Sequence, residues 1–292
     1  MTVTLELQQA PKNVVKFDKP TLVRRSEASR FLWGDDDSHY VPDLVYGRGE
    51  RIGGMIFKLT PGEYFRSSNA WRTVYDQDRY YYVVCGELTI QDPETGDVAV
   101  AKAGEAIYWS GARYHFGYNC NFEETMVLDW YAPQERAANV PEVVMSATKR
   151  KLDSRIDARE DLIGNWPAKA GIDQSLRETQ GRVMTVRPAD ALSIMHGEKN
   201  PVRIDIYASS KNLTAGVIEL RPSIMSDPEV HRGDETLFVL EGSVHVYLPD
   251  SFDLFELHPL DCLYLPEGTR HQYSNPGARL AKLAFCVTPN YK

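Results

Sequence analysis

The chain alternates short runs of apolar residues, many of them β-branched or aromatic, with turns rich in proline, glycine and aspartate. Such runs are typical of β-strands, and their regular spacing favours a sandwich or barrel. In the first half, the predicted strands are Met55–Leu59, Tyr80–Ile90, Ala106–Trp109 and Met126–Tyr131. In the second half, they are Ile204–Tyr207, Ala215–Leu220, Leu237–Val246, Asp261–Leu265 and Leu280–Val287. The pattern predicts an all-β protein.

The two β-rich blocks are separated by a more polar stretch. Within it, only the segments near 134–138 and 147–162 have a helical pattern, and the stretch before the first block looks irregular. We therefore predict four parts: an N-terminal arm, a first barrel, a partly helical connector and a second barrel. Their limits are residues 1–50, 51–135, 136–200 and 201–292.

The second block repeats the first. A shift of 156 positions aligns the two without a gap over a long span, and identical residues mark the alignment: Gly86 with Gly242, Tyr108 with Tyr264, His115 with His271, and Asn119 with Asn275. Upstream, Leu59 matches Leu220 if the first copy carries five extra loop residues. Two copies of one β-barrel are the simplest explanation of this self-similarity.

Composition and charge narrow the functional classes. The 292 residues are 42% hydrophobic and 25% charged, which is ordinary for a soluble globular protein with room for two domains. The net charge of -8 argues against sequence-independent nucleic-acid binding, which needs a positive surface. The chain has no apolar run of about 18 residues, so no membrane span is expected. Its first residues lack a signal-peptide pattern, so we expect a cytoplasmic protein.

Cysteine usage excludes two further classes of protein. The four cysteines are scattered, with no pair at short spacing: Cys85, Cys120, Cys262 and Cys286. This distribution argues against a cysteine-based zinc site and against a disulfide-rich secreted scaffold.

Two short segments of the second block gather residue types that bind metals. The first contains Glu229, His231 and Glu235, and the second contains His271 after a turn-prone stretch. Alternate residues of a strand share a face, so Glu229 and His231 should point the same way. A barrel brings the inward positions of its strands toward one axis, which could add His271. Neutral imidazole with carboxylate is a ligand set that divalent transition metals prefer.

These segments resemble the two motifs of the cupin superfamily. The first motif has two histidines one residue apart, then a glutamate and a glycine, and its last three positions are His231, Glu235 and Gly242. Its first histidine is replaced by Glu229. The second motif, Pro-x-Gly-x-x-His-x-x-x-Asn, is matched in full by Pro266, Gly268, His271 and Asn275. Together with the repeat, this resemblance implies a bicupin, with two double-stranded β-helix or jelly-roll barrels.

The resemblance implies that His231, Glu235 and His271 bind a divalent transition metal. Fe(II) is favoured, while Zn, Mn and Ni remain open, because similar sites accept several cations. Glu229 is a fourth ligand, a partner outside the ligand set, or a surface charge. The alternative is a cupin barrel without metal, in which the same residues form a buried hydrogen-bond network.

The first copy has lost most of this ligand set. Glu235 aligns with Arg79 and His231 with Tyr75, so only His115 remains. An arginine adds positive charge where a metal needs negative ligands. We therefore predict that the first barrel holds no catalytic metal and that His115 is a structural, hydrogen-bonded residue.

The predicted ligand set favours an enzyme but leaves its reaction open. Two imidazoles and one carboxylate leave coordination positions at which non-heme Fe(II) binds substrate and oxygen side by side. By resemblance, we favour a dioxygenase acting on a small aromatic or enol substrate, which Gln272 and Tyr273 could orient. One alternative is a redox-neutral isomerase, lyase or hydrolase acting on a sugar acid or keto acid, with Glu229 as a base. A second is a non-enzymatic cupin that binds a small molecule.

The expected partners also follow from the resemblance. Cupins are commonly dimers or larger assemblies, so we expect a homo-oligomer. Apart from its own copies, the expected partner is a small-molecule substrate, with neither nucleic acid nor membrane.

Overall fold

The computed structural model describes residues 14–68, 70–75, 77–93, 96–111, 113–132, 183–289 and 291. These residues are mostly β-strand, with one turn of 3-10 helix, η5 (Pro188–Asp190). No helix in this part of the chain is long and apolar enough to cross a membrane. The helical segments predicted near 134–138 and 147–162 lie outside the described residues. The all-β prediction is confirmed.

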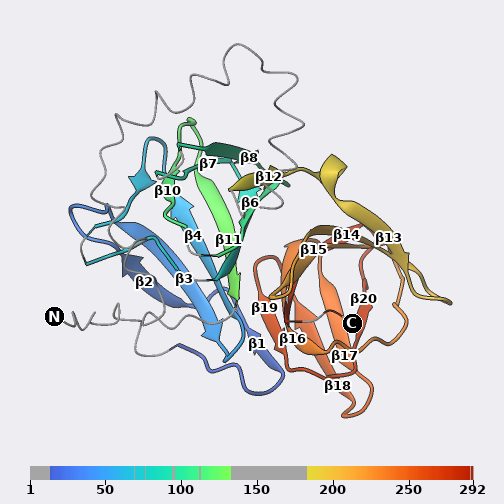
Figure 1. Ribbon diagram of the computed structural model, residues 1–292. Coiled ribbons are helices and arrows are strands. Elements are labelled where there is room, and N and C mark those ends of the chain that lie inside the picture. The colour runs from blue at the N-terminus through green and yellow to red at the C-terminus, as the bar shows by residue number, and fades with distance from the viewer. Residues whose placement is uncertain are drawn as a thin grey trace.

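The first repeat forms a barrel from two antiparallel sheets (Figure 1). The larger sheet has the order β12-β9-β6-β11-β4-β3-β2. Its strands are β2 (Ser29–Trp33), β3 (Val41–Arg48), β4 (Gly53–Leu59), β6 (Asp78–Cys85), β9 (Ala106–Trp109), β11 (Thr125–Ala132) and β12 (Met184–Val186). The smaller sheet, in the order β5-β10-β7-β8, contains β5 (Tyr64–Phe65), β7 (Glu87–Gln91), β8 (Val98–Lys102) and β10 (Phe116–Tyr118).

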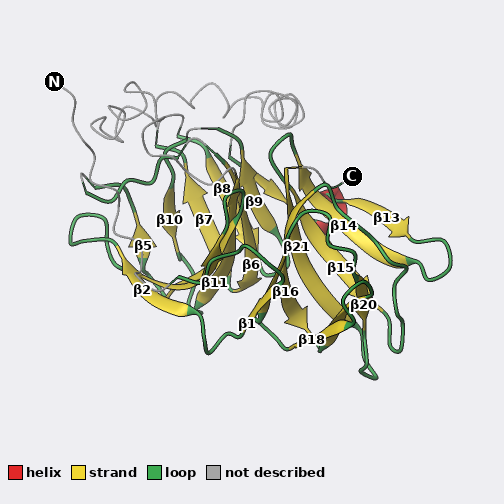
Figure 2. Cartoon of the chain, turned by 90° about the horizontal axis from the view of Figure 1, so that it is seen from below, coloured by secondary structure: helices red, strands yellow, loops and turns green. Residues whose placement is uncertain are grey.

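The second repeat is built in the same way. Its larger sheet has the order β1-β19-β16-β21-β15-β14-β13. The strands are β1 (Thr21–Val23), β13 (Leu192–His196), β14 (Val202–Ser209), β15 (Thr214–Leu220), β16 (Gly233–Glu241), β19 (Cys262–Leu265) and β21 (Ala281–Pro289). The smaller sheet, in the order β18-β17-β20, contains β17 (Val244–Leu248), β18 (Asp253–Leu257) and β20 (Gln272–Ser274). Figure 2 shows the strands of both barrels from below.

Each half of the chain contributes one strand to the larger sheet of the other barrel. The blue β1 pairs with β19 of the second repeat, and the yellow β12 pairs with β9 of the first (Figure 1). The registers are equivalent, because Thr21 lies opposite Tyr264 and Met184 lies opposite Tyr108, the matched tyrosines of the two copies. Apolar side chains of both repeats also form one buried cluster between the barrels. The two barrels are therefore joined by exchanged strands and a shared core.

Equivalent asparagines show that the repeat extends to hydrogen bonds. Asn119 Nδ2 donates to Leu59 O at 2.9 Å, and Asn275 Nδ2 donates to Leu220 O at 2.9 Å. Leu59 and Leu220 are the leucines that align across the five-residue difference in loop length. The predicted two-copy architecture is confirmed down to these buried contacts.

Two predicted strands are each two strands in the structure. The runs Tyr80–Ile90 and Leu237–Val246 divide at Gly86 and Gly242, which have φ values of +76° and +79°. Glycine adopts these angles without the clash that a Cβ would cause, so the chain turns sharply there. β6 and β16 thus belong to the larger sheets, while β7 and β17 belong to the smaller ones.

The arm and connector contain more regular structure than the sequence predicts. The segment 21–48, predicted as irregular, contributes β1, β2 and β3. The segment 183–200, predicted as connector, contributes β12 and β13. Their short apolar runs become strands because they pair with larger sheets, a tertiary effect that local pattern does not reveal. The domain limits themselves remain predictions.

Candidate metal centre

The candidate residues come from three segments of the second barrel. Glu235 lies on β16, His271 directly precedes β20, and Glu229 and His231 lie between β15 and β16. Glu229 and His271 form an isolated antiparallel bridge, in which Glu229 N donates to His271 O at 2.9 Å and His271 N donates to Glu229 O at 3.0 Å. Residues directly opposite in such a bridge place their side chains on the same face. This register turns Glu229 toward the site.

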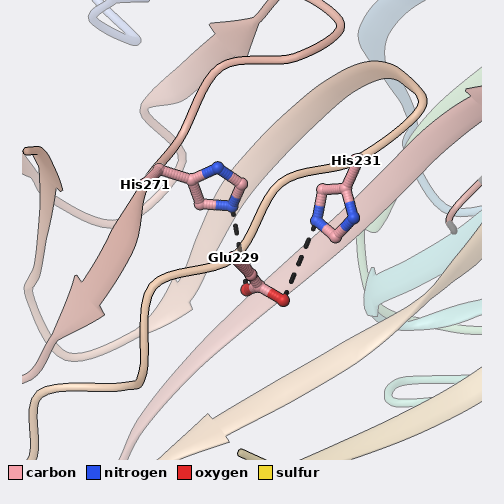
Figure 3. A group of neighbouring side chains, drawn as sticks. All are labelled: Glu229, His231 and His271. Carbon is pink, nitrogen blue, oxygen red and sulfur yellow. Dashed lines mark ion pairs between the residues drawn. The ribbon is translucent and has the colours of Figure 1, made fainter. Parts of the chain in front are cut away.

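The two imidazoles and the Glu229 carboxylate converge (Figure 3). One ligand atom from each of Glu229, His231 and His271 lies within 4.8 Å of the others. Glu235 approaches the same point, with carboxylate oxygens 3.3 Å from His271 Nε2 and 3.7 Å from His231 Nε2. None of the four residues is more than 8% exposed. They form one buried cluster of two imidazoles and two carboxylates.

A backbone carbonyl orients each imidazole. His231 Nδ1 lies 2.9 Å from Tyr291 O, and His271 Nδ1 lies 2.9 Å from Thr269 O. A carbonyl only accepts hydrogen bonds, so both Nδ1 atoms carry hydrogen and both Nε2 atoms present lone pairs. Burial lowers the pKa of His231, and it lowers the pKa of His271 to about 4 although the Glu229 charge opposes it. Both rings are therefore neutral near pH 7, the form that binds metals.

The two carboxyl groups differ in their surroundings. Burial opposes ionisation of Glu229, but contact with His196 and the neighbouring imidazoles outweigh it and lower the Glu229 pKa. Burial and the Glu229 charge raise the pKa of Glu235 well above its ordinary value, although the Tyr273 hydroxyl donates to it. Two buried carboxylates repel one another, so a cation between them would favour the ionised form of both.

The donor atoms fit a divalent metal. His231 Nε2 and both carboxylate oxygens of Glu229 are buried and have no hydrogen-bond partner. Leaving such atoms unpaired is costly, so a ligand that satisfies them stabilises the site. Imidazole nitrogen and carboxylate oxygen are both suitable donors, and two carboxylates balance the charge of a divalent ion. The Glu229, His231 and His271 group is consistent with a divalent metal.

Of the remaining predicted site residues, Tyr273 joins the cluster and Gln272 does not. The Tyr273 hydroxyl lies 2.8 Å from His271 Nε2 and 3.1 Å from Glu235 Oε1. Its single hydrogen can go to Glu235, which frees the His271 lone pair. Gln272 faces the opposite way, because neighbouring strand residues alternate, and its Nε2 donates to Ser226 O at 2.7 Å. The structure thus gathers five of the six predicted residues, and a catalytic role for Gln272 stays a prediction.

Two residues that sequence reasoning missed contact the cluster. His196, at the end of β13, places its Nε2 3.0 Å from a Glu229 carboxylate oxygen. Tyr291 supplies the carbonyl that orients His231, and its ring centre lies 4.4 Å from that of His231, with the two rings tilted by 37°. Neither lies in a cupin motif, and each reaches the site only through the folded chain. The one available signal was that a buried carboxylate such as Glu229 needs a polar partner.

The equivalent point of the first barrel holds an ion pair. Arg79, which aligns with Glu235, donates from Nε and Nη2 to Asp129 at 3.1 and 2.9 Å. Its guanidinium lies 4.7 Å from the ring centre of Tyr75, which aligns with His231. Both members of the pair are buried. A fixed guanidinium repels a metal cation at this position.

His115, the counterpart of His271, is buried among aromatic rings. Its Nε2 lies 3.0 Å from the Tyr81 hydroxyl, and its ring lies 4.6 Å from that of Trp109. Burial lowers its pKa well below the ordinary value. These contacts suit a structural histidine, and the absence of metal from this barrel stays a prediction.

Comparisons with known proteins agree with this architecture. Residues 216–288 match the family model named Cupin domain. A solved structure from Pseudomonas aeruginosa, described as a glyoxylate-induced protein, matches with a TM-score of 0.64 and 12% identity. That match covers 97% of this chain and 94% of the other. The chain is a bicupin in its fold.

Other solved structures with this bicupin fold are of differently named proteins. Oxalate decarboxylase from Bacillus subtilis, studied for its Mn(II) centres, matches with a TM-score of 0.60, 15% identity, and coverage of 97% of this chain and 80% of that one. AerE from Microcystis aeruginosa matches with a TM-score of 0.55, 9% identity, and coverage of 89% and 97%. No curated protein matched the chain. Such low identities show the fold alone, so function must be argued from the site.

Proposed function

We propose that this bicupin is a metal-dependent enzyme, an Fe(II) dioxygenase that acts on a small aromatic or enol substrate in its second barrel. The observation that supports this most is the convergence of two imidazole nitrogens and a glutamate oxygen within 4.8 Å. Two histidines and one carboxylate on one side of an ion are the arrangement that non-heme Fe(II) oxygenases use, because the other positions stay open.

In this proposal, His231, His271 and Glu229 hold the metal, and Glu235 adds a fourth donor. When bound, Fe(II) would polarise a substrate hydroxyl and supply the redox chemistry needed for reaction with oxygen. The carbonyls behind both imidazoles keep the Nε2 lone pairs aimed at one point. This support preorganises the donors before any ligand arrives.

Tyr273 would position the substrate and hold a proton. Its hydroxyl lies between His271 and Glu235, and burial raises its pKa well above the ordinary value. The phenol therefore keeps its hydrogen near pH 7 and can donate it to a substrate oxygen. Tyr291, whose ring centre lies 4.4 Å from that of His231, would give one side of the site an aromatic face suited to a planar substrate.

The charges around the site favour a phenol or enol over a polyanion. Among the described residues, the ion-pair contacts given for Glu229 and Glu235 are all with histidines, at 3.0 to 4.0 Å. No lysine or arginine is among them. A substrate with several carboxylates would therefore meet like charge with only the metal to balance it. A hydroxylated ring or enol avoids this repulsion.

A redox-neutral reaction is the second candidate. It is supported by His196, which contacts the buried Glu229. The His196 side chain is 30% exposed, so it could pass a proton between Glu229 and solvent. Glu229 would then act as a base rather than as a ligand. The likeness in fold to oxalate decarboxylase is compatible with this candidate but does not carry it, because one fold hosts many chemistries.

Oxygen consumption separates the two candidates. The protein is loaded anaerobically with Fe(II) or Mn(II) and offered catechol, hydroquinone, gentisate and a β-diketone. We expect oxygen uptake with the iron form and at least one of these substrates, and loss of uptake in Tyr273→Phe by about 10²-fold or more. An iron-loaded protein that consumes no oxygen with any of them would contradict the dioxygenase.

A further inference from the structure

We propose that His196 is the positioning residue that fixes the Glu229 carboxylate as a metal ligand. His196 ends β13, the edge strand of its sheet, and belongs to neither cupin motif. This role rests on the metal centre proposed above, and it concerns a residue that does not itself bind the metal: His196 lies outside the group of three ligand atoms that gather within 4.8 Å.

His196 makes its close contact with one of the two carboxylate oxygens of Glu229. His196 Nε2 lies 3.0 Å from Glu229 Oε2, while Glu229 Oε1 lies 3.7 Å from His271 Nε2. A carboxylate is planar, so holding one oxygen sets the rotation of the group and the direction of the other. Both oxygens are buried, and neither has a partner that meets hydrogen-bond geometry, so the 3.0 Å approach of His196 Nε2 is a close polar contact. It leaves Oε1 beside His271 Nε2.

The backbone holds these two residues together although they are far apart in sequence. Asp227, two residues before Glu229, accepts hydrogen bonds from the loop that follows His196. The donors are three consecutive backbone amides at 2.7, 2.8 and 3.1 Å, those of Glu198, Lys199 and Asn200. The loop is therefore tied to the segment that carries Glu229.

The electrostatics explain why such a partner is needed. Glu229 stands where the motif usually has a neutral histidine, so the site carries a second buried carboxylate beside Glu235. A buried carboxylate needs a donor or a cation close by. Among the described residues, three imidazole nitrogens lie within 4.0 Å of a Glu229 oxygen, those of His196, His231 and His271. Of these three histidines, His196 is the one outside the group of ligand atoms that lie within 4.8 Å of one another, and it is the nearest to Glu229.

The first repeat has neither a histidine in the place of His196 nor a glutamate in the place of Glu229. The counterpart of β13 is β2, which ends in Trp33, and the counterpart of Glu229 is Thr73. Trp33 packs its ring 5.5 Å from that of Trp71 instead of meeting a carboxylate. The histidine and the glutamate thus occur together, and only in the repeat that has the metal cluster, among the described residues.

Metal titration of the full chain tests this role. Metal-free wild type, His196→Ala and His196→Gln are titrated with Mn(II) by calorimetry, and with Co(II) by visible absorption. Removing a group that orients a ligand weakens metal binding by about 10–100-fold, which we expect for His196→Ala. A glutamine amide can still donate to the Glu229 oxygen, so His196→Gln should recover most of the affinity and the wild-type Co(II) spectrum. His258→Gln, at an exposed histidine of the same barrel, is the matched control and should bind like wild type.

The outcomes distinguish this role from the metal centre itself. If wild type binds neither ion, the proposed metal centre fails. If wild type binds both and His196→Ala keeps the same affinity and the same Co(II) spectrum, the role of His196 is wrong. Should His196→Ala fail to fold by circular dichroism, His196→Asn replaces it, since the shorter amide cannot reach Glu229. The prediction for His196→Asn is the same 10–100-fold weakening, and unchanged affinity would again overturn the role.

Discussion

The two barrels share strands, turns and buried asparagines, yet differ at the point where their chemistry would lie. Glu235 in the second barrel approaches two imidazoles, whereas Arg79 at the same place in the first is paired with Asp129. Strand order and hydrogen bonds survive this change, because pairing depends on the backbone and on apolar positions. A few inward-facing residues therefore determine whether the barrel carries carboxylates that attract a metal cation or a buried arginine that repels one.

The ion pair of the first barrel gives the largest predicted change in stability. Arg79→Met leaves Asp129 buried without a counter-charge, which should cost about 3–5 kcal/mol in the free energy of unfolding. The double variant Arg79→Met/Asp129→Leu removes both charges and should regain most of this loss. Urea unfolding measures both effects. A cost below about 1 kcal/mol for Arg79→Met would contradict the structure, in which the Asp129 carboxylate is buried away from water.

The paired asparagines test how alike the barrels are. Asn119→Ala and Asn275→Ala each leave buried backbone carbonyls without their donor, which should cost about 1–3 kcal/mol. Because the contacts to Leu59 and Leu220 have the same length, the two losses should agree within about 0.5 kcal/mol. Chemical unfolding of the two variants side by side provides the measurement. A clear difference would show that the repeats support their turns in different ways.

Of the paired glycines, Gly242 should give the smallest effect. Alanine at a positive φ costs about 1–2 kcal/mol, so Gly242→Ala should lose about this amount. Gly86→Ala should lose more, since an added Cβ would lie 2.5 Å from Glu124 O, whereas at Gly242 the nearest atom is the Ala281 Cβ at 3.0 Å. Thermal unfolding of both variants tests the order. Equal losses of stability in the two variants would mean that the backbone beside Gly86 shifts readily to make room for the added Cβ.

Much of the fold was predictable because short apolar runs indicate most of the strands, and because the internal repeat indicates two barrels. Runs such as Met126–Tyr131 are short and almost continuously apolar, as buried strands are, and His115 could be matched to His271 by position alone. β1 and β2 were missed because short segments become strands only through their neighbours. The break at Gly86 was missed because a continuous apolar run hides a change of sheet.

The site was predictable where motif spacing fixed it and unpredictable where tertiary structure did. His231, Glu235 and His271 follow from the resemblance to cupin motifs. The orientation of Glu229 depended on its bridge to His271, which sequence leaves undetermined because a shift of one residue reverses a side chain. His196 could not be found at all, since only the fold of β13 and its loop brings it to Glu229.

The central claim is that the second barrel binds one divalent metal and the first binds none. The most direct test is the elemental content of protein purified anaerobically, compared for wild type, His271→Ala and His115→Ala, the equivalent histidines of the two barrels. We predict about one metal ion per chain in wild type and in His115→Ala, and almost none in His271→Ala. Retention of metal by His271→Ala together with its loss from His115→Ala would contradict the claim.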